Sequence, residues 1–291
     1  KRYPGVLLFQ PGTVLNQSGL PFKVYTPFWR ACRSSEAPPP PRPCPREIVW
    51  YEGFDTEPVD SWELTPSAPD WAAGWDDLWQ PGEAGAAARL ESFLSGPILD
   101  YNEGRDHPAL ECTSRLSPHL RFGEISPREI WHQTQAWKSE RPAQASAADK
   151  FLSELGWREF SYHLLYYFPD LPQENLQAKF DRFPWRDDDE ALETWQRGQT
   201  GYPIVDAGMR QLWRTGWMHN RVRMICASFL VKHLLIDWRF GEQWYWDCLV
   251  DADYGNNGVN WQWISGTGVD SNMFSRIMAP LTQSEKFDAA D

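Results

Sequence analysis

The segment "GWMHNRVRMICASFLVKHLLIDW" (216–238) decides the fold class, because its apolar residues recur with the period of an α-helix. Four apolar residues share one side of this helix: Val222, Ile225, Cys226 and Phe229. The opposite side carries an amide, a guanidinium, a thioether and a methyl group: Asn220, Arg223, Met224 and Ala227. An exposed helix face is usually rich in Lys and Glu, and this one is not. The pattern favours a groove or pocket over this face, with a plain surface as the alternative.

Helix signals surround this segment and predict an all-α body of roughly 200 residues, with short connections, from about Gly85 onward. The stretch Ser126-Pro127-Arg128-Glu129 predicts a capping box with proline at the first helical position. Three more helices are expected: 149–168, closed by Pro169; 203–216, ending at Gly216; and one from about Glu242 to Leu249. We find no strand pattern after about residue 50 and no internal repeat.

The residues before this body differ from it in pattern. "GVLLF" (5–9) predicts a strand, and "FKVYTPFWRAC" (22–32) predicts the start of a helix. The proline run "EAPPPPRPCP" (36–45) predicts an extended linker, and 46–85 predicts a long irregular connector. The chain does not begin with Met and stops without a closing element, so we expect it to be a piece of a longer protein.

The overall composition is that of a globular acidic protein. Of 291 residues 42% are hydrophobic, which supports a packed core, and no apolar run approaches the roughly 18 residues that span a bilayer. The net charge of −12 argues against nucleic acid as a partner. Between Ala207 and Arg239, however, one acid accompanies six basic residues: Arg210, Arg214, Arg221, Arg223, Lys232 and Arg239. This basic segment indicates phosphate binding, with a solvated basic face as the alternative.

The cysteines indicate the cellular compartment, and the tryptophans are unusually numerous. The five cysteines are odd in number and lack a C-x-x-C pair, which excludes a zinc or disulfide framework and indicates a reducing, intracellular compartment. Cys226 lies in the apolar side of 216–238 and is expected in the core. Core packing explains most of the 18 tryptophans without obviously explaining so many.

The stretch "DADYGNNGVNWQW" (251–263) combines two acids, two glycines and a tryptophan-rich helix pattern. The stretch does not match a calcium loop, because Gly255 and Gln262 occupy positions where ligands belong. The glycines instead indicate a close backbone approach to a polar ligand. The alternative, a capped helix start, explains one Asn or Asp and not four.

The stretch "ECTSRLSPHL" (111–120) predicts a helix start at Ser117-Pro118, with hydroxyls and a guanidinium just before it. Such a start is an anion site suited to a pyrophosphate. Many Ser-Pro helix starts bind nothing, which is the alternative.

The stretch "ELGWREF" (154–160) places Glu154, Trp157 and Arg158 within one helical turn. A carboxylate beside a large flat ring can hold a base by hydrogen bonding and stacking. The alternative is a surface Glu–Arg pair beside a core tryptophan.

Together these stretches resemble the flavin-binding helical domain of the photolyase/cryptochrome family over about residues 86–288. The matching text is "TSRLSPHLRFGEISPREIW", "FLSELGWREFSYHLLYYFP", "TGYPIVDAGMRQLWRTGWMHNRVRMICASFLVKHLLIDWRFGE" and "DADYGNNGVNWQWISGTG". "MHNRVRM" resembles the class I cyclobutane pyrimidine dimer photolyases, and the histidine pair of the (6-4) photolyases is absent. The resemblance implies a mainly α fold in three parts: 1–35 as a remnant of an α/β (Rossmann-like) antenna domain, 36–85 as the linker, and 86–291 as the FAD-binding domain, incomplete at its C-terminal end.

The resemblance also implies FAD, active in its reduced form, in a folded U-shape inside the helices. The residues matching its contacts are Tyr101, Thr113, Ser114, Arg115, Leu116, Ser117, Arg158, Arg223, Asp251, Asp253 and Asn257. Asn257 matches the residue that faces flavin N5; a neutral amide there favours a reduced flavin, because it adds no negative charge beside the ring. No antenna chromophore can be assigned.

The implied function is light-driven DNA repair, in which excited reduced FAD passes an electron to a flipped-out pyrimidine dimer and the cyclobutane ring splits. The substrate side matches Glu154, Trp157, Asn220, Arg221, Met224 and Trp263. Glu154 is expected to stabilise charge on the dimer's carbonyls, either protonated or well placed. Trp261, Trp238 and Trp185 match the tryptophan chain that photoreduces the flavin.

The sequence is also compatible with two other functions. One is a cryptochrome, a blue-light receptor that binds FAD without repair; Asn257 and the complete substrate set argue against it. The other is a flavin-free helical remnant without function. For the photolyase reading we expect damaged DNA as the partner, no metal, no membrane association, a monomer, and a cytoplasmic, nucleoid-associated location.

Overall fold

The computed structural model describes residues 5–51, 53–65, 67–271 and 277–288, and within them the regular structure is helical, without strands. The α-helices are α1 (Tyr25–Ser34), α2 (Glu83–Ser95), α3 (Tyr101–Gly104), α4 (Ser117–Phe122), α5 (Pro127–Glu140), α6 (Ala145–Tyr167), α7 (Asp189–Gln196), α8 (Pro203–Thr215), α9 (Asn220–Ser228), α10 (Trp238–Cys248), α11 (Tyr254–Ser265) and α12 (Pro280–Phe287). Short 3-10 turns are η1 (Val59–Trp62), η2 (Trp75–Asp77), η3 (Pro97–Asp100), η4 (Pro142–Gln144) and η5 (Ala178–Phe180), and a π-helix, η6, covers Phe229–His233. The predicted mainly α fold is confirmed.

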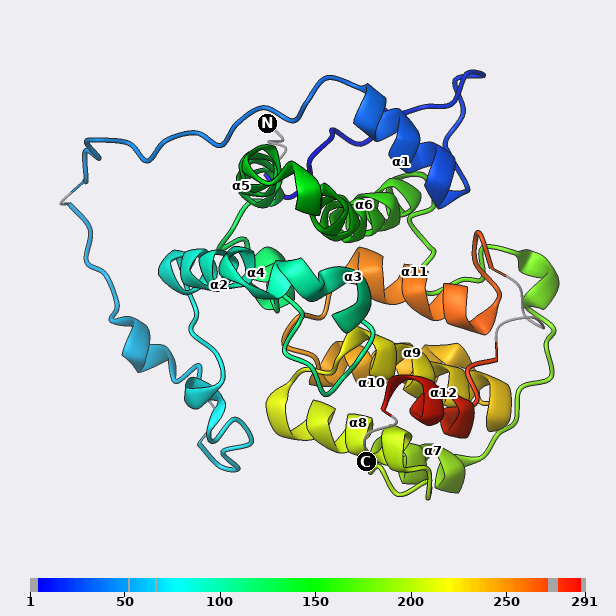
Figure 1. Ribbon diagram of the computed structural model, residues 1–291. Coiled ribbons are helices and arrows are strands. Elements are labelled where there is room, and N and C mark those ends of the chain that lie inside the picture. Colours follow the sequence, from blue (N-terminus) through cyan, green and yellow to red (C-terminus); the bar gives the residue numbers. More distant parts are fainter. Residues whose placement is uncertain (1–4, 52, 66, 272–276, 289–291) are drawn as a thin grey trace.

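The helices form two packed groups with α11 between them. Figure 1 shows α11 flanked by α6 on one side and by α9 and α10 on the other, and α11 contacts all three. One core cluster gathers around α1, α5 and α6, and the second around α7 to α10. Because α11 touches both groups, its side chains lie where the two cores meet. Among the described residues, no helix combines the length and apolar character that crossing a bilayer requires.

The expected strand at 5–9 is wrong, because this segment has no neighbouring strand to pair with in the described chain. Its backbone groups bond instead to side chains of α6. The Phe9 N–H donates to Glu159 Oε2 (3.2 Å), and Arg158 Nη1 donates to the Val6 carbonyl (2.5 Å). The helix start expected in 22–32 is confirmed as α1, which packs against α6.

The segment 216–238 contains the helix α9 and the π-helix η6 that continues it to His233, and α10 begins at its last residue, Trp238. It is not the one continuous helix that its periodicity predicts. Gly216 ends α8 in the left-handed conformation (φ +66°), as predicted, and α9 begins only at Asn220. His219 caps α9, since its Nδ1 accepts the Arg221 N–H (3.2 Å). Burial lowers the pKa of His219 to about 4, so the ring is neutral and Nδ1 can act as an acceptor. The helix expected from about Glu242 begins earlier, at Trp238, where Asp237 accepts the Arg239 N–H.

Other predicted boundaries agree with the structure more closely. Ser126 caps α5 through its side chain, and Ser117-Pro118 starts α4. The connection between α6 and α7 is longer than expected, because residues 168–188 are irregular apart from η5. The five cysteines are free thiols, and Cys226 is fully buried as predicted.

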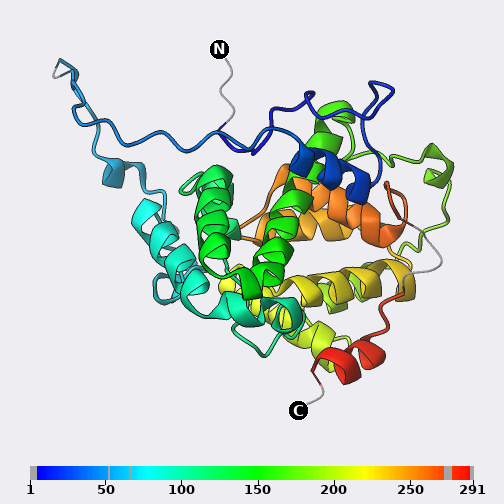
Figure 2. The ribbon, with the colours of Figure 1, turned by 45° about the horizontal axis from the view of Figure 1, so that its top comes forward.

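The connector before α2 is irregular, as expected, and Figure 2 shows much of it extending away from the helices. Its end is nevertheless attached to α8 through two indoles. Trp75 Nε1 donates to the Arg214 carbonyl (3.1 Å), and Trp79 Nε1 donates to the Thr215 carbonyl (3.0 Å). The last carbonyls of a helix have no partner within the helix, so these donors satisfy the end of α8. Part of the tryptophan excess therefore has a capping role.

Glu159 gives a testable pH dependence of stability. Its carboxyl is buried (4% exposed), and burial raises its pKa from 4.5 to about 7, against the opposing effects of the Leu8 and Phe9 N–H groups and Arg158. Since the pKa in the folded state lies above that of the unfolded chain, stability falls as the pH rises from about 4.5 to about 7. The fall amounts to about 3 kcal/mol.

We expect Glu159→Gln to remove this fall, because the amide oxygen can still accept the Phe9 N–H and does not ionise. Urea unfolding at about pH 5 and about pH 8 measures the difference. The exposed Glu91→Gln on α2 is the control and should keep the wild-type pH dependence. An equal pH dependence in Glu159→Gln and wild type would contradict the assignment.

Candidate functional site

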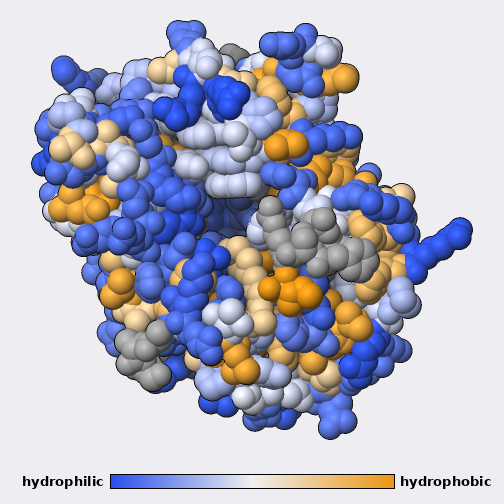
Figure 3. All heavy atoms as spheres, turned by 45° about the vertical axis from the view of Figure 1, so that its right-hand side comes forward, coloured by the Kyte–Doolittle hydropathy of each residue, from blue (hydrophilic) through white to orange (hydrophobic). Residues whose placement is uncertain are grey.

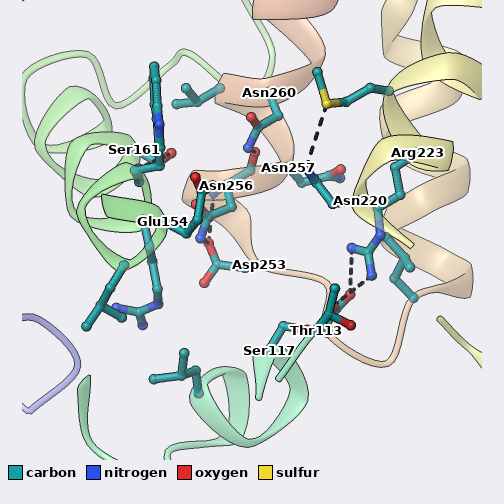
Figure 4. A pocket seen from close by; sticks show the side chains of 18 of the residues that line it. Thr113, Ser117, Glu154, Ser161, Asn220, Arg223, Asp253, Asn256, Asn257 and Asn260 are labelled. Atoms are coloured by element: carbon teal, nitrogen blue, oxygen red, sulfur yellow. Dashed lines mark hydrogen bonds and ion pairs between the residues drawn. The ribbon is translucent and has the colours of Figure 1, made fainter. Parts of the chain in front are cut away.

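A cavity of about 570 Å³ opens between α6, α9, α11 and the loop before α4. This volume lies in the range of small-molecule and cofactor sites. It receives nearly every residue predicted for cofactor, substrate or catalysis, and the two exceptions are Trp185 and Trp238. Figure 4 shows Glu154 and Ser161 entering it from α6 and Asn220 and Arg223 from α9. From α11 come Asn256, Asn257 and Asn260. The sequence pattern that favoured a pocket over α9 is confirmed.

Arg223 and Asp251 form an ion pair with two hydrogen bonds in the cavity wall. Arg223 Nη1 and Nη2 donate to the two carboxylate oxygens of Asp251 (3.0 and 2.8 Å), and Nε donates to the Met218 carbonyl (2.7 Å). Asp251 is buried and Arg223 is half-buried. A guanidinium has five N–H groups, so two remain for a ligand in the cavity. Asp251, the first acid of the 251–263 stretch, therefore forms its ion pair within the protein.

Asp253 caps α11 and is joined to α6. Its Oδ1 accepts the Asn256 N–H (2.8 Å), and its Oδ2 accepts the Tyr162 hydroxyl (2.5 Å). Asp253 is thus a helix cap, which was the alternative explanation for an acid in this stretch. It also lines the cavity. Desolvation raises the pKa of Tyr162, and the adjacent Asp253 carboxylate raises it further, so the hydroxyl stays protonated as a donor.

Asn257 is held in one orientation by α10. Its Nδ2 donates to the Glu242 backbone carbonyl (2.9 Å) and to Glu242 Oε1 (2.8 Å). Both amide hydrogens are used, so Oδ1 is the remaining polar atom of the side chain. Burial raises the pKa of Glu242, while the Asn257 hydrogen bond lowers it. The Asn257 side chain therefore enters the cavity wall in a fixed position.

A substitution at Glu242 tests this anchoring. We expect Glu242→Ala to weaken FAD retention about fivefold, because one net hydrogen bond of roughly 1 kcal/mol that orients Asn257 is lost. Glu242→Gln keeps an oxygen acceptor and should retain FAD within about twofold of wild type. The neighbouring exposed Gln243→Ala controls for general effects on α10. Titration of FAD into the apoprotein, followed by flavin fluorescence, gives the affinities of wild type and the three variants; equal affinities would rule out the anchoring role.

The loop before α4 has the chemistry of a phosphate site. Thr113, Ser114 and Ser117 bring hydroxyls to the cavity, and Arg115 adds a guanidinium. Arg115 Nη2 donates to Glu111 Oε1 (2.8 Å), yet its buried Nε has no partner among the described residues. A buried donor without an acceptor is costly, so it fits a site that receives an anionic ligand. Together with the cavity volume, this orphaned donor fits the diphosphate of FAD.

The cavity is also lined by the residues predicted for the substrate. Two cations contact the Glu154 carboxylate: Arg105, through Nη1, and Lys150, at 3.1 Å. Asn220 Nδ2 lies 3.7 Å from Met224 Sδ, on the polar face of α9. Arg221 Nη2 pairs with Asp106 (2.7 Å). These ion pairs hold the Glu154 side chain in one position at the cavity wall.

The predicted tryptophan chain is only partly visible as contacts. Trp261 lines the cavity, and its ring contacts are with Tyr245 (4.9 Å between centroids) and Trp195 (6.3 Å). Trp238 is fully buried, with Nε1 bonded to Asn175, and Trp185 packs against Phe183 (4.4 Å). Trp238 and Trp261 belong to one core cluster and Trp185 packs against it, and their order as a chain stays a prediction.

The basic segment 207–239 is not one continuous surface. Arg221 and Arg223 line the cavity, Lys232 donates to the Ser265 carbonyl, and Arg239 pairs with Asp237. Only Arg210 and Arg214, both on α8, are exposed and lack an ion pair within the described residues. Figure 3 shows a hollow in one face of the molecule, bordered mainly by hydrophilic residues.

Sequence reasoning missed several residues of the cavity wall. Ser161 lies one and two turns beyond Trp157 and Glu154 on α6, so the same helical spacing could have identified it. Asn256 and Asn260 fall inside the quoted 251–263 stretch, one turn apart. No local pattern indicates Arg105, because its role depends on a contact 49 positions further along the chain.

Comparison with known proteins agrees with this geometry. The family model described as the FAD binding domain of DNA photolyase matches residues 151–291. The deoxyribodipyrimidine photo-lyase of Agrobacterium fabrum is 50% identical over 99% of this chain and 60% of its own length. Cryptochrome-1 of Arabidopsis thaliana is 36% identical over 97% of this chain and 42% of its own length.

A solved photolyase structure is also similar to this chain. The crystal structure of a bacterial class III photolyase from Agrobacterium tumefaciens superposes with a TM-score of 0.94 at 51% identity, covering 98% of this chain and 59% of that one. The chain spans about three fifths of the length of the photolyases it matches. It therefore belongs to the photolyase/cryptochrome family and includes the FAD-binding domain.

Proposed function

We propose that the protein containing this chain is a deoxyribodipyrimidine photo-lyase, which repairs cyclobutane pyrimidine dimers in DNA with light. The observation that carries the proposal is that one cavity is lined by two sets of residues. Arg115, Arg223 and Asp251 form the set suited to FAD, and Glu154 and Asn220 belong to the set suited to a dimer. The relatives named photo-lyase support the same activity.

Electron donation to the dimer under light is the chemistry that reduced FAD supplies when bound. The chain's own residues bind and orient the reactants. Arg115 and the hydroxyls of 113–117 hold the diphosphate, and Arg223, fixed by Asp251, holds the flavin side. Asn257, fixed by Glu242, supplies a neutral amide at the flavin edge. Glu154 orders Arg105 and Lys150 at the wall where charge develops on the dimer.

The test uses the full-length protein loaded with reduced FAD. Under illumination it should restore the thymine absorbance of an oligonucleotide that contains a dimer, and in the dark it should not. Unchanged absorbance under light, with FAD bound, would remove the enzymatic proposal and favour the cryptochrome alternative, a class that also includes a relative of this chain.

The subgroup is a finer proposal. The string "MHNRVRM" suggested class I, and this remains a prediction. The 51% identity to a photolyase described as class III favours class III instead. We further propose residues 1–35 as the end of an antenna domain, a monomeric protein, damaged DNA as its partner, and a cytoplasmic location.

A further inference from the structure

Trp157 is the flat ring of the predicted substrate wall, and its position is set from outside α6. Trp157 is half-buried and lines the cavity on the same side of α6 as Glu154. The Tyr25 ring of α1 stacks on it, with 3.6 Å between centroids and 10° between planes. Tyr25 is buried (7% exposed) and does not line the cavity, so it covers the side of the indole turned away from the cavity.

Tyr25 is itself fixed to the helical turn that carries the substrate wall. Its hydroxyl donates to the Ser153 carbonyl (2.6 Å) and lies 2.8 Å from Ser153 Oγ. Ser153 precedes Glu154 and lies one turn before Trp157, so the hydroxyl and ring of Tyr25 contact the same turn of α6. Burial raises the pKa of this hydroxyl, which keeps it protonated as a donor.

Phe160 supports both rings from the side, and Gly156 lets their helices pack closely. Phe160 meets both Tyr25 and Trp157 edge-on, at 6.0 and 6.1 Å. Gly156 lets α1 approach closely, because a Cβ there would lie 2.5 Å from the Trp29 ring. The indole therefore has its rear face covered and its edge supported, and only the cavity side remains for a ligand.

We propose that Tyr25 is a positioning residue for the substrate, which holds Trp157 ready to stack on a flipped-out pyrimidine dimer. This inference rests on the proposed photo-lyase function. It assigns part of the specificity for the dimer to α1, a helix outside the FAD-binding part. A fixed indole loses less freedom on binding than a mobile one, so the stack contributes to affinity for the dimer and not to FAD binding.

The test measures affinity in the dark by fluorescence anisotropy, with matched oligonucleotides that do or do not contain a dimer, on the FAD-loaded full-length protein. Tyr25→Leu should weaken dimer binding about fivefold, the scale of an aromatic pair, and leave undamaged DNA binding and FAD content unchanged. Repair at saturating oligonucleotide should stay within about twofold of wild type, because the loss lies in binding. Tyr25→Phe keeps the ring and should restore affinity to within about twofold.

Phe28→Leu is the matched control. Phe28 is a buried α1 residue that packs on Phe160 and His163 without a ring contact to Trp157, so it reports general loosening of α1. Wild-type dimer affinity in Tyr25→Leu, or an equal loss in Phe28→Leu, overturns the inference alone. An equal loss on both oligonucleotides also overturns it. A wild-type protein that does not distinguish the two oligonucleotides overturns the proposed function and this inference with it.

Discussion

Replacing Arg223 by alanine should abolish FAD retention, with affinity falling at least about a hundredfold. The substitution removes the two N–H groups that remain for a ligand, and it leaves the Asp251 carboxylate buried without its cation. Breaking a buried ion pair in this way costs about 3–5 kcal/mol. The melting temperature should therefore fall by roughly 10 °C as well. Flavin absorbance after gel filtration and a thermal melt measure the two effects.

The double substitution Arg223→Met, Asp251→Leu separates binding from stability. Two apolar side chains of similar volume should recover most of the melting temperature, because no charge is left unpaired. They should not recover FAD, since no donor returns to the cavity. The exposed Arg214→Ala is the control for removing a positive charge. Recovery of FAD by the double variant would contradict a direct role of Arg223.

Helix ends could be predicted from the sequence where neighbouring residues determine them. Features that depend on contacts with distant residues could not. Gly216, Ser126 and Ser117-Pro118 marked helix ends correctly, because the residues that terminate or cap a helix lie beside it in the chain. The periodicity of 216–238 could not reveal the break before α9, since it depends on a neutral buried His219 acting as a cap. The strand expected at 5–9 failed because a strand needs partner strands, which no single segment specifies.

In the site, too, some residues could be predicted from local sequence and others could not. Most of the cavity-lining residues come from four segments that the sequence analysis identified: 111–120, 154–160, 216–238 and 251–263. A helix repeats its face every three or four positions, so residues that share a face can be recognised from their spacing. These segments could not supply the second partner of each contact. Glu242 beside Asn257, Arg105 beside Glu154 and Tyr25 behind Trp157 are pairs that only tertiary packing brings together. These partners determine how the cavity-lining side chains are oriented. The sequence therefore indicated the chemistry of the site better than the geometry of the site.

Substitution of Glu154 by alanine should lower repair by at least about tenfold while FAD stays bound. The carboxylate contacts both Arg105 and Lys150 at the cavity wall, so its loss frees the two cations that face the charge developing on the dimer. None of the contacts made by Arg115, Arg223 or Asp251 involves Glu154. The flavin spectrum should therefore match that of wild type, and dimer splitting per absorbed photon gives the repair efficiency.

Two matched variants show whether charge or shape matters at this position. Glu154→Gln keeps the shape and one acceptor but cannot form an ion pair, so it should recover only part of the activity. Glu193→Ala on α7 breaks an exposed ion pair with Arg197, the residue that follows this helix, and should leave repair unchanged. If Glu154→Ala repairs dimers as well as wild type, the carboxylate has no part in the reaction. If wild type and Glu154→Ala both bind FAD and neither repairs dimers, the chain belongs to a light receptor, because its cavity then holds the flavin without acting on DNA.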